Sequence, residues 1–170
     1  SASIASMFLA NKIPTIVFAR SRLRAEVISS YLKEKNRLAK IAAYRGGYLP
    51  NERREIERRL RERDLDCVVS TNALELGIDI GMLDAVVTTG YPGSVSSLLQ
   101  QFGRAGRRGS PSLAVMTASS SPLDQYIADN PRFLAEANPE SAIINPDNLL
   151  ILMDHMKCAA FELPFSEDER

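Results

Sequence analysis

Two arginines stand three residues apart, among glycines, in the segment 100–109, which reads QQFGRAGRRG. An arginine side chain stays charged at any working pH, and its planar guanidinium matches the geometry of a phosphate. Gly103 and Gly106 let the backbone turn tightly and approach a ligand closely. Arg104 and Arg107 project from one short turn, so both can reach the same charged group. This arrangement favours a clamp on the terminal phosphate of a nucleotide. A basic loop of this kind could equally bind a stray anion or cover the end of a helix.

Two further segments carry polar side chains directly after apolar strands. Segment 70–80 (STNALELGIDI) places two hydroxyls and an amide at the end of a strand, followed by a glycine and an acid. Thr71 has the chemistry to donate to a phosphate and Asp79 to accept from a ribose hydroxyl, and both also suit an ordinary loop. Segment 18–22 (FARSR) sets Ser21 at a helix start, where it suits a phosphate site or a plain N-cap.

The chain contains neither the phosphate-binding motif GxxxxGK[ST] nor an acidic Asp-Glu box. In ATP-hydrolysing proteins these motifs hold the phosphates and Mg²⁺. The arginine loop, residues 100–109, therefore lacks the partners that a complete phosphate site requires.

Short apolar strands alternate with helical patterns along the chain. Strands are predicted at 15–19, 40–44, 67–70, 84–89 and 113–117. This alternation predicts an α/β domain over residues 1–120, with a mostly parallel central sheet covered by helices on both faces. Ligands of such sheets bind beyond the carboxyl ends of the strands, where the polar segments follow.

Helices are predicted at 21–35, 52–63 and 94–102. In the first, an inward apolar face is expected from Leu23, Val27, Ile28, Tyr31 and Leu32. In the second, Asn51 is the expected N-cap and Ile56 and Leu60 point inward. The pairs Glu55–Arg59 and Glu57–Arg61 favour a solvated face over a nucleic-acid surface.

Residues 121–170 are predicted to form a helical extension. One helical stretch runs from 122 towards 137, and a final amphipathic helix spans about 147–160. Its apolar stripe is typical of a core or domain-docking face and consists of Leu149, Leu152, Met153 and Met156.

The composition is that of an ordinary globular protein. Twenty-one basic and 21 acidic residues give a formal net charge of zero, and 45% of residues are hydrophobic. This balance argues against a purely electrostatic nucleic-acid binder, so any nucleic-acid contact is expected to be local. No apolar run approaches the ~20 residues that cross a membrane, and the start of the chain lacks a signal-like pattern. We expect no membrane contact and a cytoplasmic location.

The cysteines predict neither a disulfide framework nor a metal site. Cys67 and Cys158 lie far apart and form no CxxC spacing. His155 lies three residues from Cys158, but two ligands do not make a metal site. Cys67 opens an apolar strand and is expected in the core.

Taken together, the order and spacing of these segments resemble the second, C-terminal RecA-like domain of superfamily-two DEAD/DEAH-type helicases. Segment 18–22 matches the fourth motif of that family, 70–79 the fifth, and 100–107 the sixth, which has the form Q-x-x-G-R-x-G-R. Segment 44–47 (YRGG) matches the intervening phosphate-contacting segment. The resemblance covers about residues 13–118.

The amino-acid sequences of several segments are similar to those of the MrfA-like, Hrq-type DNA repair helicases. The similar segments are 44–50, 72–81 and 90–93, together with 122–126 and 158–164. The last two resemble that group's link to a C-terminal domain, in which metal-binding cysteines lie further on.

The resemblance implies a RecA-like three-layer fold and a role as the second motor domain of an ATP-dependent DNA helicase that moves 3′ to 5′. ATP and Mg²⁺ would bind between this domain and an N-terminal RecA-like domain of the same polypeptide, while the motor tracks a single DNA strand. The chain alone would be inactive.

The resemblance also implies roles for single residues. Arg104 and Arg107 would contact the γ-phosphate, with Arg107 as the arginine finger. The other ATP-binding residues would be Gln100, Gly77, Asp79 and Gly103. The DNA backbone would be held by Ser21, Arg22, Gly46 and Thr71. Gln101 departs from the arginine of many relatives, which leaves the role of that position open.

Two alternatives stand beside this interpretation. One is a binding module with a helicase-like fold and no motor role, against which the intact Arg104, Arg107 and Asp79 argue. The other is an RNA helicase domain, against which Gln100 and the segment 74–77 argue, because they match the DNA group.

Overall fold

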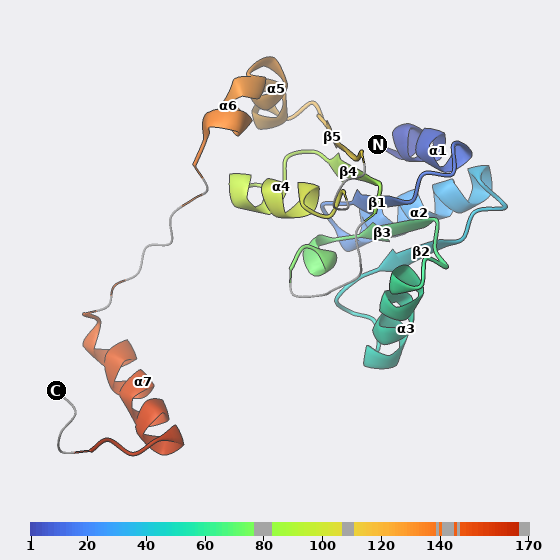
Figure 1. The fold of residues 1–170 in the computed structure, drawn as a ribbon. Helices are drawn as coiled ribbons and strands as arrows, with labels where there is room; N and C mark the ends of the chain where they lie inside the picture. The colour runs from blue at the N-terminus through green and yellow to red at the C-terminus, as the bar shows by residue number, and fades with distance from the viewer. Residues whose placement is uncertain (77–82, 107–110, 139, 141–144, 146, 167–170) are drawn as a thin grey trace. The chain divides into compact units, whose positions relative to one another are not determined.

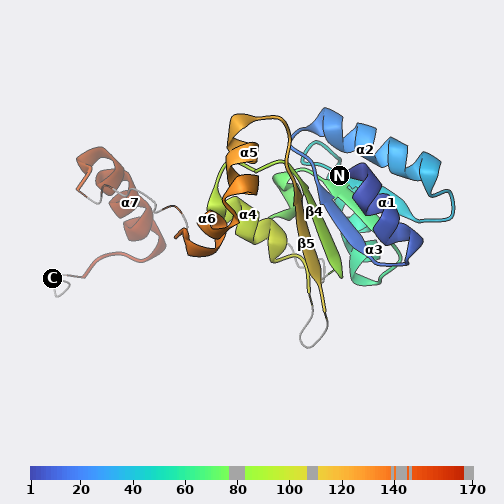
Figure 2. The same ribbon diagram turned by 90° about the horizontal axis from the view of Figure 1, so that it is seen from above.

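The computed structural model describes residues 1–76, 83–106, 111–138, 140, 145 and 147–166. The chain forms two compact units, residues 1–140 and 141–170. The first unit holds a five-stranded sheet with helices against it (Figures 1 and 2).

The sheet has the strand order β2-β3-β1-β4-β5, and all neighbouring strands are parallel. The strands are β1 (Thr15–Phe18), β2 (Ile41–Tyr44), β3 (Cys67–Ser70), β4 (Ala85–Thr89) and β5 (Leu113–Thr117). In register, Thr15 of β1 lies between Cys67 and Ala85. The predicted parallel α/β sheet is confirmed, and its strands all end at the same edge.

The core has two layers, one on each face of the sheet. Alternate strand residues point to opposite faces, so Val17 packs in one layer while Ile16 and Phe18 pack in the other. The first layer is covered by α1 (Ala2–Ala10) and α2 (Arg22–Lys35). The second is covered by α3 (Pro50–Arg61), the short helix η1 (Asn72–Leu74) and α4 (Val95–Phe102). This arrangement confirms the three-layer architecture, and Cys67 lies in the core as expected.

The predicted inward face of α2 is partly wrong. Leu23 is 75% exposed and Val27 is 60% exposed. The buried positions of α2 are Ala25, Ile28, Ser29 and Leu32. The helix therefore turns the small residues Ala25 and Ser29 to the sheet, because a small side chain allows a close helix-to-sheet approach. Three of the predicted inward residues, Leu23, Val27 and Tyr31, remain exposed.

The predicted start of α3 also needs correction. Helix α3 begins at Pro50, which suits a first helical position, so Asn51 lies inside the helix and is not its cap. Instead the Glu52 carboxylate accepts a hydrogen bond from the backbone N–H of Leu49 at 3.1 Å. Helix α1 has no counterpart among the sequence predictions.

The outer face of α3 is laced with ion pairs, as a solvated face would be. Arg58 pairs with both Glu55 and Glu62, and Arg59 pairs with Asp64. Glu57 instead accepts a hydrogen bond from the Tyr44 hydroxyl at 2.6 Å. Ile56 and Leu60 pack against the core, as predicted.

The stretch after β5 is divided into two helices, α5 (Pro122–Asp129) and α6 (Pro131–Glu136). The break follows from Pro131, which has no N–H to continue the hydrogen bonds of α5. Ile127 of α5 is buried with Tyr91 and Leu98, and Leu134 of α6 packs against them. Both helices thus belong to the first unit.

The second unit contains helix α7 (Leu149–Glu162). The side chains of its predicted apolar stripe are exposed: Leu149, Leu152, Met153 and Met156. His155 and Cys158 are exposed as well.

Candidate functional site

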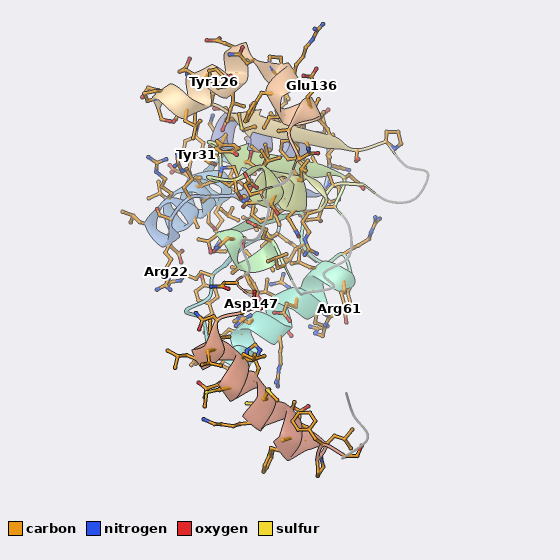
Figure 3. All side chains as sticks on the ribbon, turned by 90° about the vertical axis from the view of Figure 1, so that its left-hand side faces the viewer. Arg22, Tyr31, Arg61, Tyr126, Glu136 and Asp147 are labelled. Atoms are coloured by element: carbon orange, nitrogen blue, oxygen red, sulfur yellow. The ribbon has the colours of Figure 1, made fainter. Side chains whose placement is uncertain are left out.

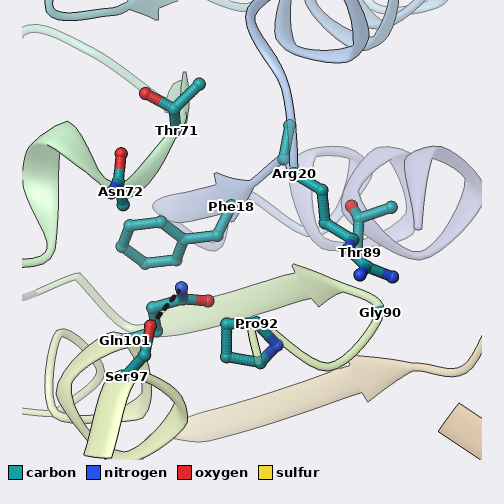
Figure 4. Close-up of a pocket in the computed structure, with 10 residues that line it drawn as sticks. Phe18, Arg20, Thr71, Asn72, Thr89, Gly90, Pro92, Ser97 and Gln101 are labelled. Atoms are coloured by element: carbon teal, nitrogen blue, oxygen red, sulfur yellow. Dashed lines mark hydrogen bonds between the residues drawn. The ribbon is translucent and has the colours of Figure 1, made fainter. Parts of the chain in front are cut away.

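A cavity of about 320 Å³ opens at the carboxyl ends of β1, β3 and β4 (Figure 4). This is the edge at which parallel α/β sheets bind ligands. Its lining side chains are mostly polar or small and come from Phe18, Ala19, Arg20, Thr71, Asn72, Thr89, Gly90, Pro92, Ser97 and Gln101. Arg20 supplies positive charge, and Thr71 and Asn72 supply hydrogen-bond donors. We call this space the strand-edge cavity.

Of the predicted nucleic-acid residues, Thr71 lines the strand-edge cavity and the other three lie outside its lining. Ser21 is the N-cap of α2, and its Oγ accepts a hydrogen bond from the backbone N–H of Arg24 at 3.2 Å. The exposed side chain of Arg22 extends from the start of α2 away from the core (Figure 3). Its guanidinium comes within 3.9 Å of the position that a Cβ on Gly47 would take. The structure therefore brings Arg22 beside the segment that contains Gly46.

Arg20 lies in the lining of the cavity, near a buried carboxylate that the sequence did not single out. Asp124 is 1% exposed, and its two oxygens accept from the backbone N–H groups of Tyr91 at 3.1 Å and Ser119 at 2.8 Å. Desolvation by burial raises the pKa of Asp124, but hydrogen bonds from Ser119 and Tyr91 and the charge of Arg20 outweigh it, so the pKa lies below its usual value. Asp124 thus ties the loops after β4 and β5 together.

Gly90 leaves room for this arrangement. Its φ is +77°, and a Cβ there would lie 2.8 Å from Asp124 Oδ2 and 3.2 Å from the Arg20 side chain. A side chain at this position would displace the Asp124 carboxylate and the Arg20 side chain.

Residues 103–106 of the arginine loop directly follow α4, and Arg104 and Gly106 bond to Glu75 and Leu83. The Arg104 guanidinium donates from Nη2 to the main-chain oxygen of Glu75 at 2.7 Å. The backbone of Leu83 donates to the oxygen of Arg104 at 3.2 Å and accepts from the N–H of Gly106 at 2.9 Å. Gly106 has a φ of +99°, and a Cβ there would lie 2.7 Å from Ser112 Oγ.

A second cavity of about 400 Å³ adjoins this loop, and we call it the arginine-loop cavity. Three predicted nucleotide-binding residues line it, namely Gln100, Gly103 and Arg104, together with Glu75, Ser96 and Leu99. Gly77, Asp79 and Arg107 lie outside the described residues. The chemistry at hand is an arginine and an amide on an open wall, which suits the phosphates of a nucleotide.

Sequence reasoning missed the buried polar pair between the two cavities. Glu75 is 8% exposed and Gln101 is 5% exposed, and Gln101 Nε2 donates to Glu75 Oε2 at 3.0 Å. The only sequence signal was the departure noted at Gln101, because the type of a polar residue does not reveal its burial.

The start of α4 is capped twice. Ser94 Oγ accepts from the backbone N–H of Ser97 at 3.0 Å. The Glu140 carboxylate accepts from the N–H groups of Ser96 at 3.0 Å and Val95 at 2.6 Å, which lowers the pKa of Glu140. Helix α4, which leads into the arginine loop, is therefore anchored at its first turn.

Among the described residues, no group of three or more His, Cys, Asp or Glu side chains is placed to hold a metal ion. No helix in the described part of the chain is long and apolar enough to span a membrane.

Residues 3–109 match the family model described as the helicase conserved C-terminal domain, and the chain belongs to that family. Residues 144–170 match a model described as the winged helix domain of ATP-dependent helicase HRQ1.

Similar proteins indicate which type of helicase the domain resembles. The chain is 61% identical to the uncharacterized ATP-dependent helicase YprA of Bacillus subtilis, over 98% of this chain and 23% of that protein. It is 41% identical to ATP-dependent helicase HRQ1 of Saccharomyces cerevisiae, over 98% of this chain and 16% of that protein. The crystal structure of the DUF1998 helicase MrfA bound to DNA and AMPPNP matches with a TM-score of 0.89 and 59% identity, over 99% of this chain and 24% of that one. The chain is thus a C-terminal RecA-like domain of the Hrq and MrfA type within superfamily two, and it spans about a quarter or less of these relatives.

Proposed function

We propose that this chain is the second motor domain of an ATP-dependent DNA helicase that acts in DNA repair and moves 3′ to 5′. An N-terminal RecA-like domain of the same polypeptide supplies the P-loop and the Mg²⁺-binding acids. Arg104 and Arg107 contact the γ-phosphate of ATP in the cleft between the domains, with Arg107 as the arginine finger. Gln100, Gly77, Asp79 and Gly103 complete this wall of the nucleotide site.

One observation carries the proposal: Arg104 of the arginine loop lines an open cavity, and an arginine there suits one side of a phosphate site. Arg104 is fixed there by its hydrogen bond to the Glu75 oxygen, and Gln100 and Gly103 line the same space. No cluster of acids for Mg²⁺ accompanies them in the described part of the chain. When bound, Mg²⁺ neutralises phosphate charge, and its ligands fit better on the P-loop domain.

The DNA-binding side of the proposal rests on the strand-edge cavity. Arg20, Thr71 and Asn72 offer charge and donors to a phosphodiester backbone, which carries no base sequence. Arg22 and Gly46, which lie outside the lining of this cavity, add a second proposed contact to the DNA backbone beside the segment 44–47. Ser21 accepts the capping bond, and a hydroxyl that accepts one hydrogen bond can still donate one to a phosphate. That MrfA binds DNA and AMPPNP in its crystal structure supports both ligands here.

The test uses a polypeptide that joins this chain to its P-loop domain. We expect ATP hydrolysis that single-stranded DNA stimulates more than RNA of the same length, and unwinding of a duplex with a 3′ tail but not a 5′ tail. The chain of 170 residues alone serves as the control and should hydrolyse no ATP above background. Hydrolysis that ignores DNA would support a binding module instead, and a stronger response to RNA would support an RNA helicase.

A further inference from the structure

Glu75 occupies an unusual position for a carboxylate. It directly follows η1, three residues beyond the Thr71–Asn72 wall of the strand-edge cavity, and only 8% of it is exposed. Charged side chains are rarely buried unless hydrogen bonds hold them. Here Glu75 Oε2 accepts from Ser97 Oγ at 2.8 Å and from Gln101 Nε2 at 3.0 Å.

The two donors form the α4 side of the strand-edge cavity. Ser97 and Gln101 lie one helical turn apart, both line that cavity, and Gln101 Nε2 also approaches Ser97 Oγ at 3.4 Å (Figure 4). A ligand that moves either side chain therefore moves a partner of the Glu75 carboxylate.

The other end of Glu75 belongs to the second cavity. Its main-chain oxygen accepts from Arg104 at 2.7 Å, and both residues line the arginine-loop cavity. One residue thus holds the α4 wall of one cavity through its side chain and the arginine of the other through its backbone. Buried networks of this kind have few alternative arrangements, because each lost hydrogen bond leaves a buried polar group unpaired.

We infer that Glu75 and Gln101 are positioning residues that couple occupation of the strand-edge cavity by a phosphodiester backbone to the placement of Arg104 at the nucleotide. The inference rests on the proposed function, since it assigns the two cavities to the DNA and to the phosphates of ATP. DNA in the strand-edge cavity fixes Ser97 and Gln101, these fix Glu75, and Glu75 holds Arg104. The coupling works in both directions, so a bound nucleotide strengthens DNA binding by the same factor.

The experiment measures that factor in the polypeptide with both motor domains. Fluorescence anisotropy gives the Kd for single-stranded DNA with and without a non-hydrolysable ATP analogue. For the wild type we expect the ratio of the two values to be about 5–150, the usual range of such coupling. In Gln101→Glu two carboxylates face each other, and the ratio should fall to within about twofold of one.

The exchange Glu75→Gln with Gln101→Glu rebuilds the hydrogen bond in the opposite direction and should restore most of the ratio. The melting temperatures of the single variant and the exchange variant are measured beside the ratio. If the two temperatures are equal, recovery of the ratio reports coupling and not a gain in stability. Gln101→Met, which removes the bond without adding charge, replaces Gln101→Glu if that variant does not fold. The control for added charge is Ser30→Glu on the exposed side of α2, which should keep the full ratio.

A wild-type ratio that Gln101→Glu leaves unchanged overturns the coupling, and so does an exchange that rescues nothing. A wild type whose DNA affinity ignores the nucleotide overturns it as well. Each of these results is distinct from failure of the proposed function, which would appear as ATP hydrolysis that DNA does not stimulate.

Discussion

At the scale of single residues, buried carboxylates organise this site as much as its arginines do. Asp124 ties two loops at the strand-edge cavity, and Glu75 stands between the two cavities. Both accept hydrogen bonds whose loss would leave a buried charge unpaired, which is costly in a protein interior. Arg104 is thus held by the backbone of a residue whose own side chain is buried in a hydrogen-bond network.

The lowered pKa of Asp124 predicts how the free energy of unfolding changes with pH. A carboxyl whose folded pKa lies below its unfolded value of about 3.9 stabilises the fold above that value and loses this contribution as pH falls through the folded pKa. Asp124→Asn should lower the free energy of unfolding at pH 7 by about 1.5–3 kcal/mol, the size of a hydrogen bond to a charged group. The difference from wild type should shrink below about pH 4.

Urea unfolding of the 170-residue chain between pH 7 and pH 3 measures this difference. Asp129→Asn, on an exposed position of the same helix, is the control and should change little. A deficit of Asp124→Asn that stays constant over the whole pH range would refute the assignment.

At the scale of elements, α4 connects the site. It is capped at its start by Ser94 and Glu140, carries Ser97 and Gln101 at the strand-edge cavity, and ends at Phe102 within the arginine loop. Its anchoring therefore bears on both cavities.

Removing the side-chain cap should weaken this element measurably. Ser94→Ala deletes the acceptor for the Ser97 N–H and should cost about 0.5–2 kcal/mol of unfolding free energy. Ser96→Ala changes the same residue type inside the helix, where alanine is the better helix former, and should be neutral or slightly stabilising. Denaturant titration of both variants decides the matter, and equal effects would mean that the Ser94 hydroxyl is not a cap.

Some of these elements could be predicted from the sequence and others could not. The strands were predictable because β-branched runs such as Val68–Val69 are buried on both faces of a parallel sheet and leave an unbroken apolar signal. Part of the inward face of α2 was not, because Ala25 and Ser29 are buried by their place against the sheet and not by their hydrophobicity. The arginine loop was evident from spacing, whereas the Glu75–Gln101 pair depends on a contact between residues 26 positions apart.

At the scale of the whole molecule, the two units have different characters. The first closes its own core around the parallel sheet. The second holds α7 with its apolar side chains exposed, in the region that matches the winged helix domain of HRQ1. The first unit alone carries both cavities, so the proposed motor chemistry belongs to it.

The central claim is that this domain lends an arginine to ATP held by another domain. The most direct measurement is the DNA-stimulated kcat for ATP hydrolysis of Arg107→Ala in the polypeptide that contains both motor domains. An arginine finger is worth about 10³–10⁵ in rate, so kcat should fall by that order while the Kd for DNA changes little. Arg54→Ala, an exposed arginine of α3, should keep the wild-type rate. A kcat of Arg107→Ala within about threefold of wild type would contradict the account, because that loss is far below what a finger contributes.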